Sequence, residues 1–270
     1  MTFDLQKKRD ALLKVRENLR HKGEERMSNT TRIGTTVAGA LLGVLFVTGC
    51  ATEKCAPQSS TLDGLLLHYS FDKDESAGIS DNSGNGNVGI VRGAKYSPDG
   101  KAGGAYQVGS KVGYIETPDK MIRSFDGTSF TIAFWFKANA HFGGQQMFIA
   151  QDEGGGSKPK WAFMTSHGSL TFHVVNPSLA GAWIAATPWV PQIDKWYHLA
   201  VTRSANTYSI YVDGVCVASQ TNLMPIPAIN APLTIGQGEN LYVEGLVDEL
   251  MVFKRALSKL EIKKLSDAAN

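Results

Sequence analysis

The most constraining feature of the sequence is a series of short apolar segments, rich in aromatic residues and separated by Gly, Asn, Asp and Pro. In the segment 129–137, SFTIAFWFK, the residues Phe130, Ile132, Phe134 and Phe136 alternate with Thr131, Ala133, Trp135 and Lys137. A period of two is typical of a β-strand with one face in the core. About a dozen such segments follow one another without helical periodicity. This pattern predicts an antiparallel sandwich or barrel.

Turn signals divide the chain between these segments. Ser166-His167-Gly168 separates two alternating runs, and Asp213-Gly214 interrupts another. Such sequences are typical of tight β-hairpins. We therefore predict strands within residues 65–71, 129–137, 147–151, 160–165, 169–175, 195–203, 207–219, 233–237 and 244–254.

One helix is predicted, at the C-terminus. Ser258-Lys259-Leu260-Glu261 has the spacing of a capping box, in which the Ser and Glu side chains bond each other's backbone amides. Apolar residues then recur at helical spacing. We expect this helix to dock on the sandwich through Leu257, Leu260, Ile262 and Leu265.

The N-terminal segment has the features of an export signal. Residues 33–49 are uncharged and largely apolar, follow Arg32, and end in Val47-Thr48-Gly49-Cys50. This resembles the bacterial lipobox, which implies that Cys50 is lipidated and becomes the new N-terminus; an uncleaved membrane anchor is the alternative. Residues 1–26 are explained either by a start codon assigned too early or by a short tail removed with the signal peptide.

The predicted organisation has three parts. Residues 1–49 form an N-terminal extension and signal helix, residues 50–61 form a polar tether, and residues 62–270 form the folded domain. We expect an exported protein anchored to a cell-envelope membrane, facing the periplasm or the surface. Ala51 resembles the residue found in lipoproteins sent to the outer membrane of Gram-negative cells.

Charge and cysteine content exclude several classes of function. The chain after Cys50 is slightly acidic and has no basic run, which argues against nucleic-acid binding. The three cysteines are not spaced for a zinc site or a disulfide framework. Cys216 is predicted to be a small buried hydrophobe, and Cys55 an unused thiol, with acylation or an intermolecular bridge as alternatives.

A resemblance extends over residues 65–265. Its pieces occur in the order Tyr69-Ser70-Phe71-Asp72, residues 81–87, residues 129–137, Trp196-Tyr197-His198-Leu199-Ala200, residues 210–214, residues 233–236, residues 245–250 and residues 255–262. This order resembles the laminin-G-like jelly-roll domain of the concanavalin A-like lectin/glucanase superfamily. The resemblance implies an all-β fold of two antiparallel sheets. It says little about the ligand, because one fold supports many functions.

The same resemblance implies a structural calcium ion. The oxygen donors at the matching positions are Asp72 and Asp248, with Asn85 and the carbonyl groups of residues 81–87 completing the shell. Ca²⁺ requires six to eight oxygen ligands, which these groups can supply in part. The alternative is that both aspartates are exposed to solvent or bonded to turn amides.

Glycan binding is the general expectation for this superfamily. Trp135, Trp161 and Trp196 occupy positions typical of its strands, so we expect them to pack in the fold. Trp183 and Trp189 lie in residues 176–192, which the family pattern does not specify, and they are the candidate ligand-binding residues. His198 is expected to be a buried sheet histidine.

No catalytic pattern is found. Polysaccharide-cleaving relatives carry two glutamates that flank an aspartate on one strand, and this pattern is missing from the sequence. Asp248 and Glu249 are adjacent, so on a regular strand they would point to opposite faces. We predict a non-catalytic module that binds a glycan or an envelope or extracellular ligand. The alternatives are a structural protein–protein interaction domain and a divergent glycoside hydrolase or lyase.

Overall fold

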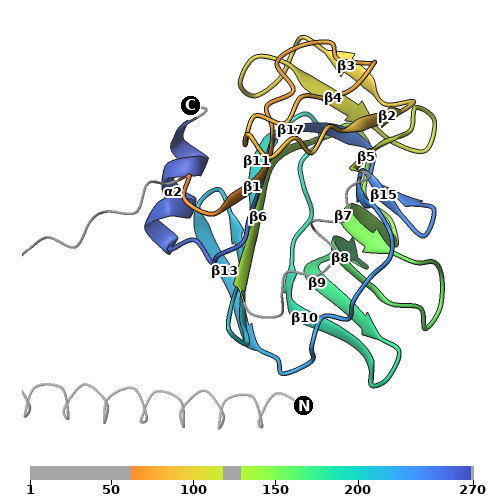
Figure 1. Ribbon diagram of the computed structural model, residues 1–270, viewed down its shortest axis with the longest axis vertical. Helices are drawn as coiled ribbons and strands as arrows, with labels where there is room; N and C mark the ends of the chain where they lie inside the picture. Colours follow the sequence, from red (N-terminus) through yellow and green to blue (C-terminus); the bar gives the residue numbers. More distant parts are fainter. Residues whose placement is uncertain (1–61, 118–128, 269–270) are drawn as a thin grey trace, which may run out of the picture. The chain divides into compact units, whose positions relative to one another are not determined.

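Two antiparallel sheets face each other in the computed structural model, which describes residues 62–117 and 129–268 (Figure 1). The first sheet, called sheet I, has β6 at its centre, between β11 and β17. β1 adds to the other side of β17, beside β4. In spatial order, sheet I contains β13 (Val215–Thr221), β12 (Thr207–Val212), β11 (Trp196–Ser204), β6 (Ser129–Ala138), β17 (Gly245–Phe253), β4 (Ala105–Val108) and β3 (Lys95–Ser97), with β1 (Leu65–Tyr69) against β17.

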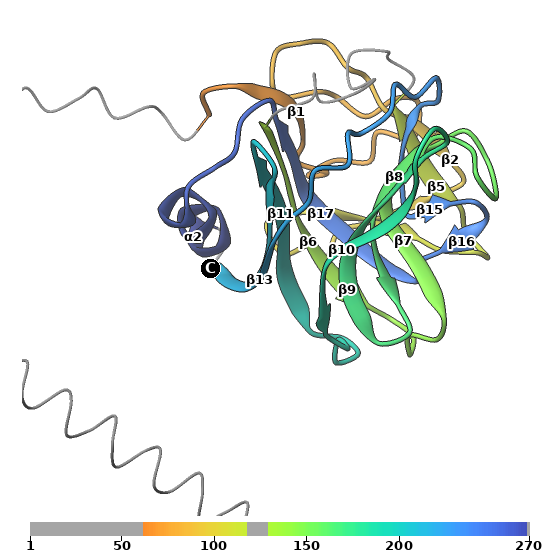
Figure 2. The ribbon, with the colours of Figure 1, turned by 90° about the horizontal axis from the view of Figure 1, so that it is seen from below.

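The second sheet, called sheet II, covers the opposite side of the core (Figure 2). The short hairpin of β15 (Gln237–Gly238) and β16 (Leu241–Tyr242) attaches to it through β7. In spatial order, its path contains β10 (Ala180–Pro188), β9 (Ser169–Asn176), β8 (Lys160–Ser166), β7 (Gln145–Asp152), β14 (Leu233–Ile235), β5 (Tyr114–Thr117) and β2 (Ile90–Arg92). This arrangement confirms the predicted jelly-roll sandwich.

The core lies between the sheets and is largely aromatic. Phe130, Phe134 and Phe136 of β6 are fully buried and contact rings from the facing sheet, including Phe148 and Phe172. The alternation of residues 129–137 is therefore confirmed. Trp161 also packs in this core, stacked on a phenylalanine ring.

Both hairpin turns form as predicted. His167 and Gly168 join β8 to β9 with φ values of 46° and 80°, and Asp213 and Gly214 join β12 to β13 with φ values of 51° and 78°. Two successive positive φ values match the right-handed twist of the flanking strands. Each turn therefore sets the register of its hairpin.

The C-terminal helix α2 (Lys259–Ala268) packs on the outer face of sheet I, away from sheet II (Figure 2). The capping box forms: the Glu261 amide donates to Ser258 Oγ at 3.3 Å, and the Ser258 amide donates to Glu261 Oε2 at 2.8 Å. Leu257 and Ile262 are buried as expected. The prediction for Leu260 is wrong, since this side chain is exposed on the face turned away from the sheet.

Several strands were not predicted. β2 to β5 contain only three or four residues each, which is too short for a recognisable alternation. β10 lies within residues 176–192, for which the sequence predicts no strand. Its sequence AGAWIAATP is rich in alanine, which is depleted in strands.

The predicted signal segment, Cys50 and Cys55 lie outside the described residues. Within residues 62–117 and 129–268, no helix has the length and hydropathy required to cross a membrane. Cys216 is half-buried and packs near α2, so it is less enclosed than predicted.

Candidate functional site

The outer face of sheet II presents one exposed tryptophan. Trp183 lies on the edge strand β10 and is 44% exposed. His173 of β9 stands directly opposite it, and the two rings stack with centroids 4.0 Å apart and planes 24° from parallel. The His173 Nδ1 atom lies 3.0 Å from the Ala182 carbonyl oxygen, which fixes the imidazole. The imidazole thus supports one face of the indole, while the indole keeps substantial exposure to solvent.

A shallow hollow of about 360 Å³ lies beside this tryptophan. Its lining comes from four neighbouring strands and the turn between β8 and β9. The side chains are mostly small and polar, with hydroxyl and amide groups. They are Gln145, Ser166, His167, Ser169, Thr171, Trp183 and Ala186.

Strand register explains why these side chains meet. Gln145 pairs with Ser166, and Ser166 pairs with Ser169, so the three lie in one row across β7, β8 and β9. Cross-strand partners share a face of the sheet. Thr171 lies two residues further along β9, and its hydroxyl donates to the Ile184 carbonyl of β10 at 3.0 Å.

A β-bulge in β10 gives the hollow its outer wall. The pairing register shifts between Ile184 and Thr187, and Ala185 adopts a φ of 54°. The Ala185 amide donates to Gln220 Oε1 of β13 at 2.7 Å instead of continuing the ladder. Bulges redirect side chains and bend edge strands. Here the bulge leaves Ala186 on the lining of the hollow.

The site carries no permanent charge. None of the lining residues is Lys, Arg, Asp or Glu. Burial lowers the pKa of His173 below its ordinary value, so the ring beneath Trp183 is neutral at pH 7. The hollow therefore offers hydrogen bonds and an aromatic face to an uncharged ligand.

Trp189 does not join Trp183 in this site. Its ring makes edge-on contacts with Phe148 and Tyr197, with centroids 6.2 Å and 5.5 Å apart, and it packs against the core. Trp161 is in the core, as expected. Trp135 and Trp196 lie on sheet I, and the Lys137 ammonium lies 5.1 Å from the Trp196 ring centroid.

Of the residues expected to bind calcium, Asp248 is fully buried on β17. Its Oδ2 atom accepts hydrogen bonds from the amides of Lys101 and Ala102, at 2.7 Å and 2.9 Å, and its Oδ1 atom accepts one from the Glu249 amide at 2.7 Å. Burial raises the pKa of this carboxyl to about 7. The loop 100–104 thus covers the carboxylate and provides two of the amides that bind it.

Asp72 reaches the same loop, whereas Asn85 does not. A Cβ atom at Gly103 would overlap Asp72 Oδ1, so that carboxylate lies directly against residues 100–104. Asn85 Nδ2 instead donates to the carbonyls of Leu65 and Leu66, at the beginning of β1. Asp72 follows the end of β1, so the structure brings Asp72 and Asp248 to one loop and leaves Asn85 at the far end of the strand.

Asp248 and Glu249 do not point to opposite faces as the sequence suggested. β17 contains a bulge between Asp248 and Met251, and Glu249 adopts a φ of 48°. The bulge lies where β17 changes neighbours, since β4 pairs before it and β1 pairs after it. Both carboxylates lie on the outer side of sheet I, where His68 Nε2 lies 2.8 Å from Glu249 Oε2.

The residues that sequence reasoning missed are the polar ones of the hollow. Gln145, Ser166, Ser169 and Thr171 are ordinary strand and turn residues when read singly. Assigning residues 180–188 to a strand beside residues 169–176 would have indicated them. Only the pairing of β9 with β10 puts Trp183 on the same face as Thr171.

Two facing antiparallel sheets with this strand order define a jelly-roll sandwich, and an outer face of it carries an exposed tryptophan beside an uncharged polar hollow. The sequence supports this class over more than half of its length. The chain belongs to the concanavalin A-like lectin/glucanases superfamily, whose Laminin_G_3 family matches residues 109–263. No curated protein matches the sequence.

Solved structures share the fold at low identity. One is domain 4 of AbnA, a GH43 extracellular arabinanase from Geobacillus stearothermophilus, in complex with arabinotriose. It is 22% identical, with a TM-score of 0.61, and the match covers 75% of this chain and 98% of that domain.

Two toxin binding domains are also similar. The binding domain of Paraclostridial Mosquitocidal Protein 1 is 19% identical, with a TM-score of 0.59 and coverage of 77% of this chain and 53% of that one. The botulinum neurotoxin serotype G binding domain is 16% identical, with a TM-score of 0.60 and coverage of 75% and 50%. The chain spans about half the length of these two domains, and at such identities the likeness shows the fold alone.

Proposed function

We propose that this chain is a non-catalytic module that binds neutral glycans on the outer face of sheet II. The observation that carries the proposal is Trp183, exposed on the edge strand β10 beside a hollow of hydroxyl and amide groups. The apolar C–H face of a sugar can stack on the indole, while its hydroxyls bond to the side chains of Gln145, Ser166 and Ser169. The arabinotriose bound to the arabinanase domain supports a glycan as the ligand class.

The lining also supports binding without catalysis. Glycoside hydrolysis needs a pair of carboxylates on either side of the scissile bond. No Asp or Glu lines the hollow. The absence of Lys and Arg from the lining favours neutral sugars over uronic acids, whose carboxylates would have no cationic partner there.

Calorimetry with the purified protein tests the proposal, after a glycan array has selected neutral oligosaccharides, with arabinotriose included. Trp183→Ala is expected to weaken binding at least about tenfold, because it removes the stacking surface. The matched control is Trp196→Ala, which removes a half-buried tryptophan from sheet I and should leave the affinity unchanged. Equal affinity in the Trp183 variant and the parent protein would refute the site.

Calcium is a second part of the proposal. We propose that Ca²⁺ is bound by Asp72, by the remaining lone pair of Asp248 Oδ1, and by carbonyl oxygens of the loop 100–104. A fully buried carboxylate without a cationic side chain among its hydrogen-bond partners supports this. The described residues contain no group of three or more acidic, His or Cys side chains suited to a metal, so backbone oxygens and water must supply most ligands.

Thermal unfolding in Ca²⁺ and in EGTA tests this part. Ca²⁺ should raise the melting temperature of the parent protein and have little effect on Asp72→Asn. An unchanged melting temperature in the parent protein would rule out the ion and leave both carboxylates with amide partners only.

We also propose that Cys50 is lipidated and holds the module at the cell envelope after export. The lipobox-like sequence before it supports this. Cys50→Ser is expected to abolish incorporation of labelled fatty acid and to leave unprocessed precursor. Labelling that persists in this variant would refute the assignment.

A further inference from the structure

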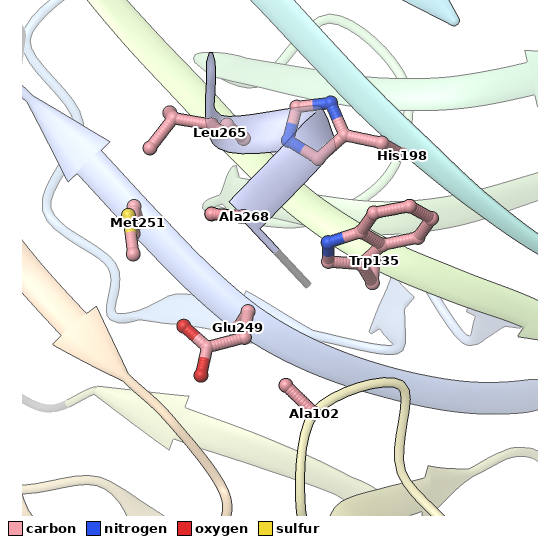
Figure 3. Close-up of a pocket in the computed structure, with 8 residues that line it drawn as sticks. Ala102, Trp135, His198, Glu249, Met251, Leu265 and Ala268 are labelled. Atoms are coloured by element: carbon pink, nitrogen blue, oxygen red, sulfur yellow. The ribbon is translucent and has the colours of Figure 1, made fainter. Parts of the chain in front are cut away.

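A second cavity lies on the other side of the sandwich, between α2 and the outer face of sheet I. It has a volume of about 170 Å³ and is far from the Trp183 hollow, which opens on sheet II. Figure 3 shows its walls: strand residues on one side and the last turn of α2 on the other. The principal lining residues are Trp135, His198, Glu249, Met251, Leu265 and Ala268.

The cavity contains one buried polar side chain without a partner. His198 is only 2% exposed, and its ring makes no hydrogen bond to the described residues. Its Nδ1 atom is enclosed by protein, so Nε2 is the ring nitrogen that can face the cavity. Its ring lies edge-on to Trp135, with centroids 5.4 Å apart, and projects over the cavity (Figure 3). Buried polar groups in folded proteins are almost always hydrogen-bonded, because an unpaired one costs free energy. An unpaired imidazole on a cavity wall therefore points to a group that the cavity receives.

The remaining lining limits what that group can be. Most other lining side chains are apolar, from alanine, methionine and leucine. The one acidic side chain, Glu249, is engaged by His68 at 2.8 Å. Burial lowers the pKa of His198 to about 4, so its ring is neutral at pH 7 and can share a hydrogen bond with a hydroxyl.

The size of the cavity fixes the size of the ligand. A 150 Å³ apolar cavity in another protein binds benzene, and this cavity is slightly larger. We infer that the cavity beneath α2 binds a small uncharged molecule that has an apolar body of about the size of one aromatic ring and a hydroxyl group bonded to His198. This site is independent of the glycan site, because the two share no residue.

Phenol and toluene are the probes, since they have nearly the same shape and differ in the hydroxyl. Binding is followed by NMR titration of the Trp135 indole and His198 imidazole resonances in the whole protein. Phenol should bind with a Kd of about millimolar order, as expected for so few atoms. Toluene should bind about three- to tenfold more weakly, because one neutral hydrogen bond is lost.

Two variants and one control make the test specific. Ala268→Leu fills the cavity from the exposed end of α2 and should abolish binding of both probes. His198→Phe keeps the ring but removes its nitrogens, so phenol should lose its advantage over toluene. Lys264→Leu adds an apolar side chain on the exposed face of the same helix and should change nothing.

Three results would overturn the inference. The first is the absence of shifts at Trp135 and His198 with phenol. The second is equal affinity for phenol and toluene in the parent protein, which would mean that the cavity is apolar and that His198 does not recognise the hydroxyl group. The third is phenol binding that survives Ala268→Leu, which would place the ligand elsewhere.

Discussion

His198 should make the domain sensitive to mild acid, and the size of the effect follows from its burial. The pKa of this imidazole falls from 6.5 in the unfolded chain to about 4 in the folded protein, because burial disfavours the charged ring. Above pH 6.5 the imidazole is neutral in both the folded and the unfolded protein, so it has no effect on the pH dependence of stability. As the pH falls below 6.5, the imidazole is protonated in the unfolded chain but stays neutral in the folded protein, so the free energy of unfolding decreases.

The free energy of unfolding is expected to decrease, relative to neutral pH, by about 2 kcal/mol at a pH of about 5 and by about 3 kcal/mol below a pH of about 4. Other groups titrate in the same range, and the raised pKa of Asp248 acts in the opposite direction. The measurement must therefore be a difference between two proteins. Urea unfolding of the parent protein and of His198→Phe is compared at pH 7.5 and at about pH 5.

The parent protein should lose about 2 kcal/mol more than the variant over this interval. The phenylalanine keeps the edge-on contact with Trp135 and cannot titrate. If the stabilities of the two proteins change in parallel, His198 is protonated equally in both states and the reasoning about its burial is refuted. A larger loss in the variant would reverse the sign and refute it as well.

Three further predictions concern stability, each measured by urea unfolding at neutral pH. Gly214→Ala should lower the free energy of unfolding by about 1 kcal/mol or more, because φ is 78° and the new Cβ would approach a lysine side chain of α2. The control Gly155→Ala, with open space around the new Cβ, should lower it by less than half as much. Equal losses would contradict the turn argument. Glu261→Gln should lower the free energy of unfolding by about 1 kcal/mol, because it removes the ion pair with Arg255 and the charge on the acceptor of the Ser258 amide. Its effect should disappear as the pH falls from 4.5 towards 2, where the native carboxylate becomes protonated. Ile262→Ala should cost about 2 to 4 kcal/mol because the side chain is fully buried, whereas Leu260→Ala should stay within about 0.5 kcal/mol; the reverse order would mean that α2 docks through its other face.

The long strands could be predicted because each contains enough residues to display its period. Phe130, Phe134 and Phe136 alternate over ten residues of β6, and the facing core requires that alternation. The strands β2 to β5 are set mainly by pairing with distant partners, such as Glu116 with Ile90 and Thr234. No local pattern in residues 90–117 carries that information.

The candidate site was predictable only in part, for a similar reason. Trp183 was selected because the family pattern leaves its segment open, but its exposure depends on the pairing of β10 with β9. Trp189 looks equivalent in sequence, yet aromatic rings of β7, β11 and the segment between β6 and β7 cover it. Likewise, no sequence signal shows that Ser166 and Thr171 line one hollow, since this needs the register across three strands.

The bulge in β17 makes the outer face of sheet I sensitive to the insertion or deletion of a single residue. Val247 and Leu250 both enter the core, so the extra residue between them lets two acidic neighbours share the outside of the sheet. Deleting either acidic residue would restore regular alternation, with Val247 and Leu250 still in the core and a single carboxylate on the outer face. A change of length by one residue at this point would therefore decide whether the outer face carries both the loop-covered aspartate and the glutamate beside the α2 cavity, or only one of them.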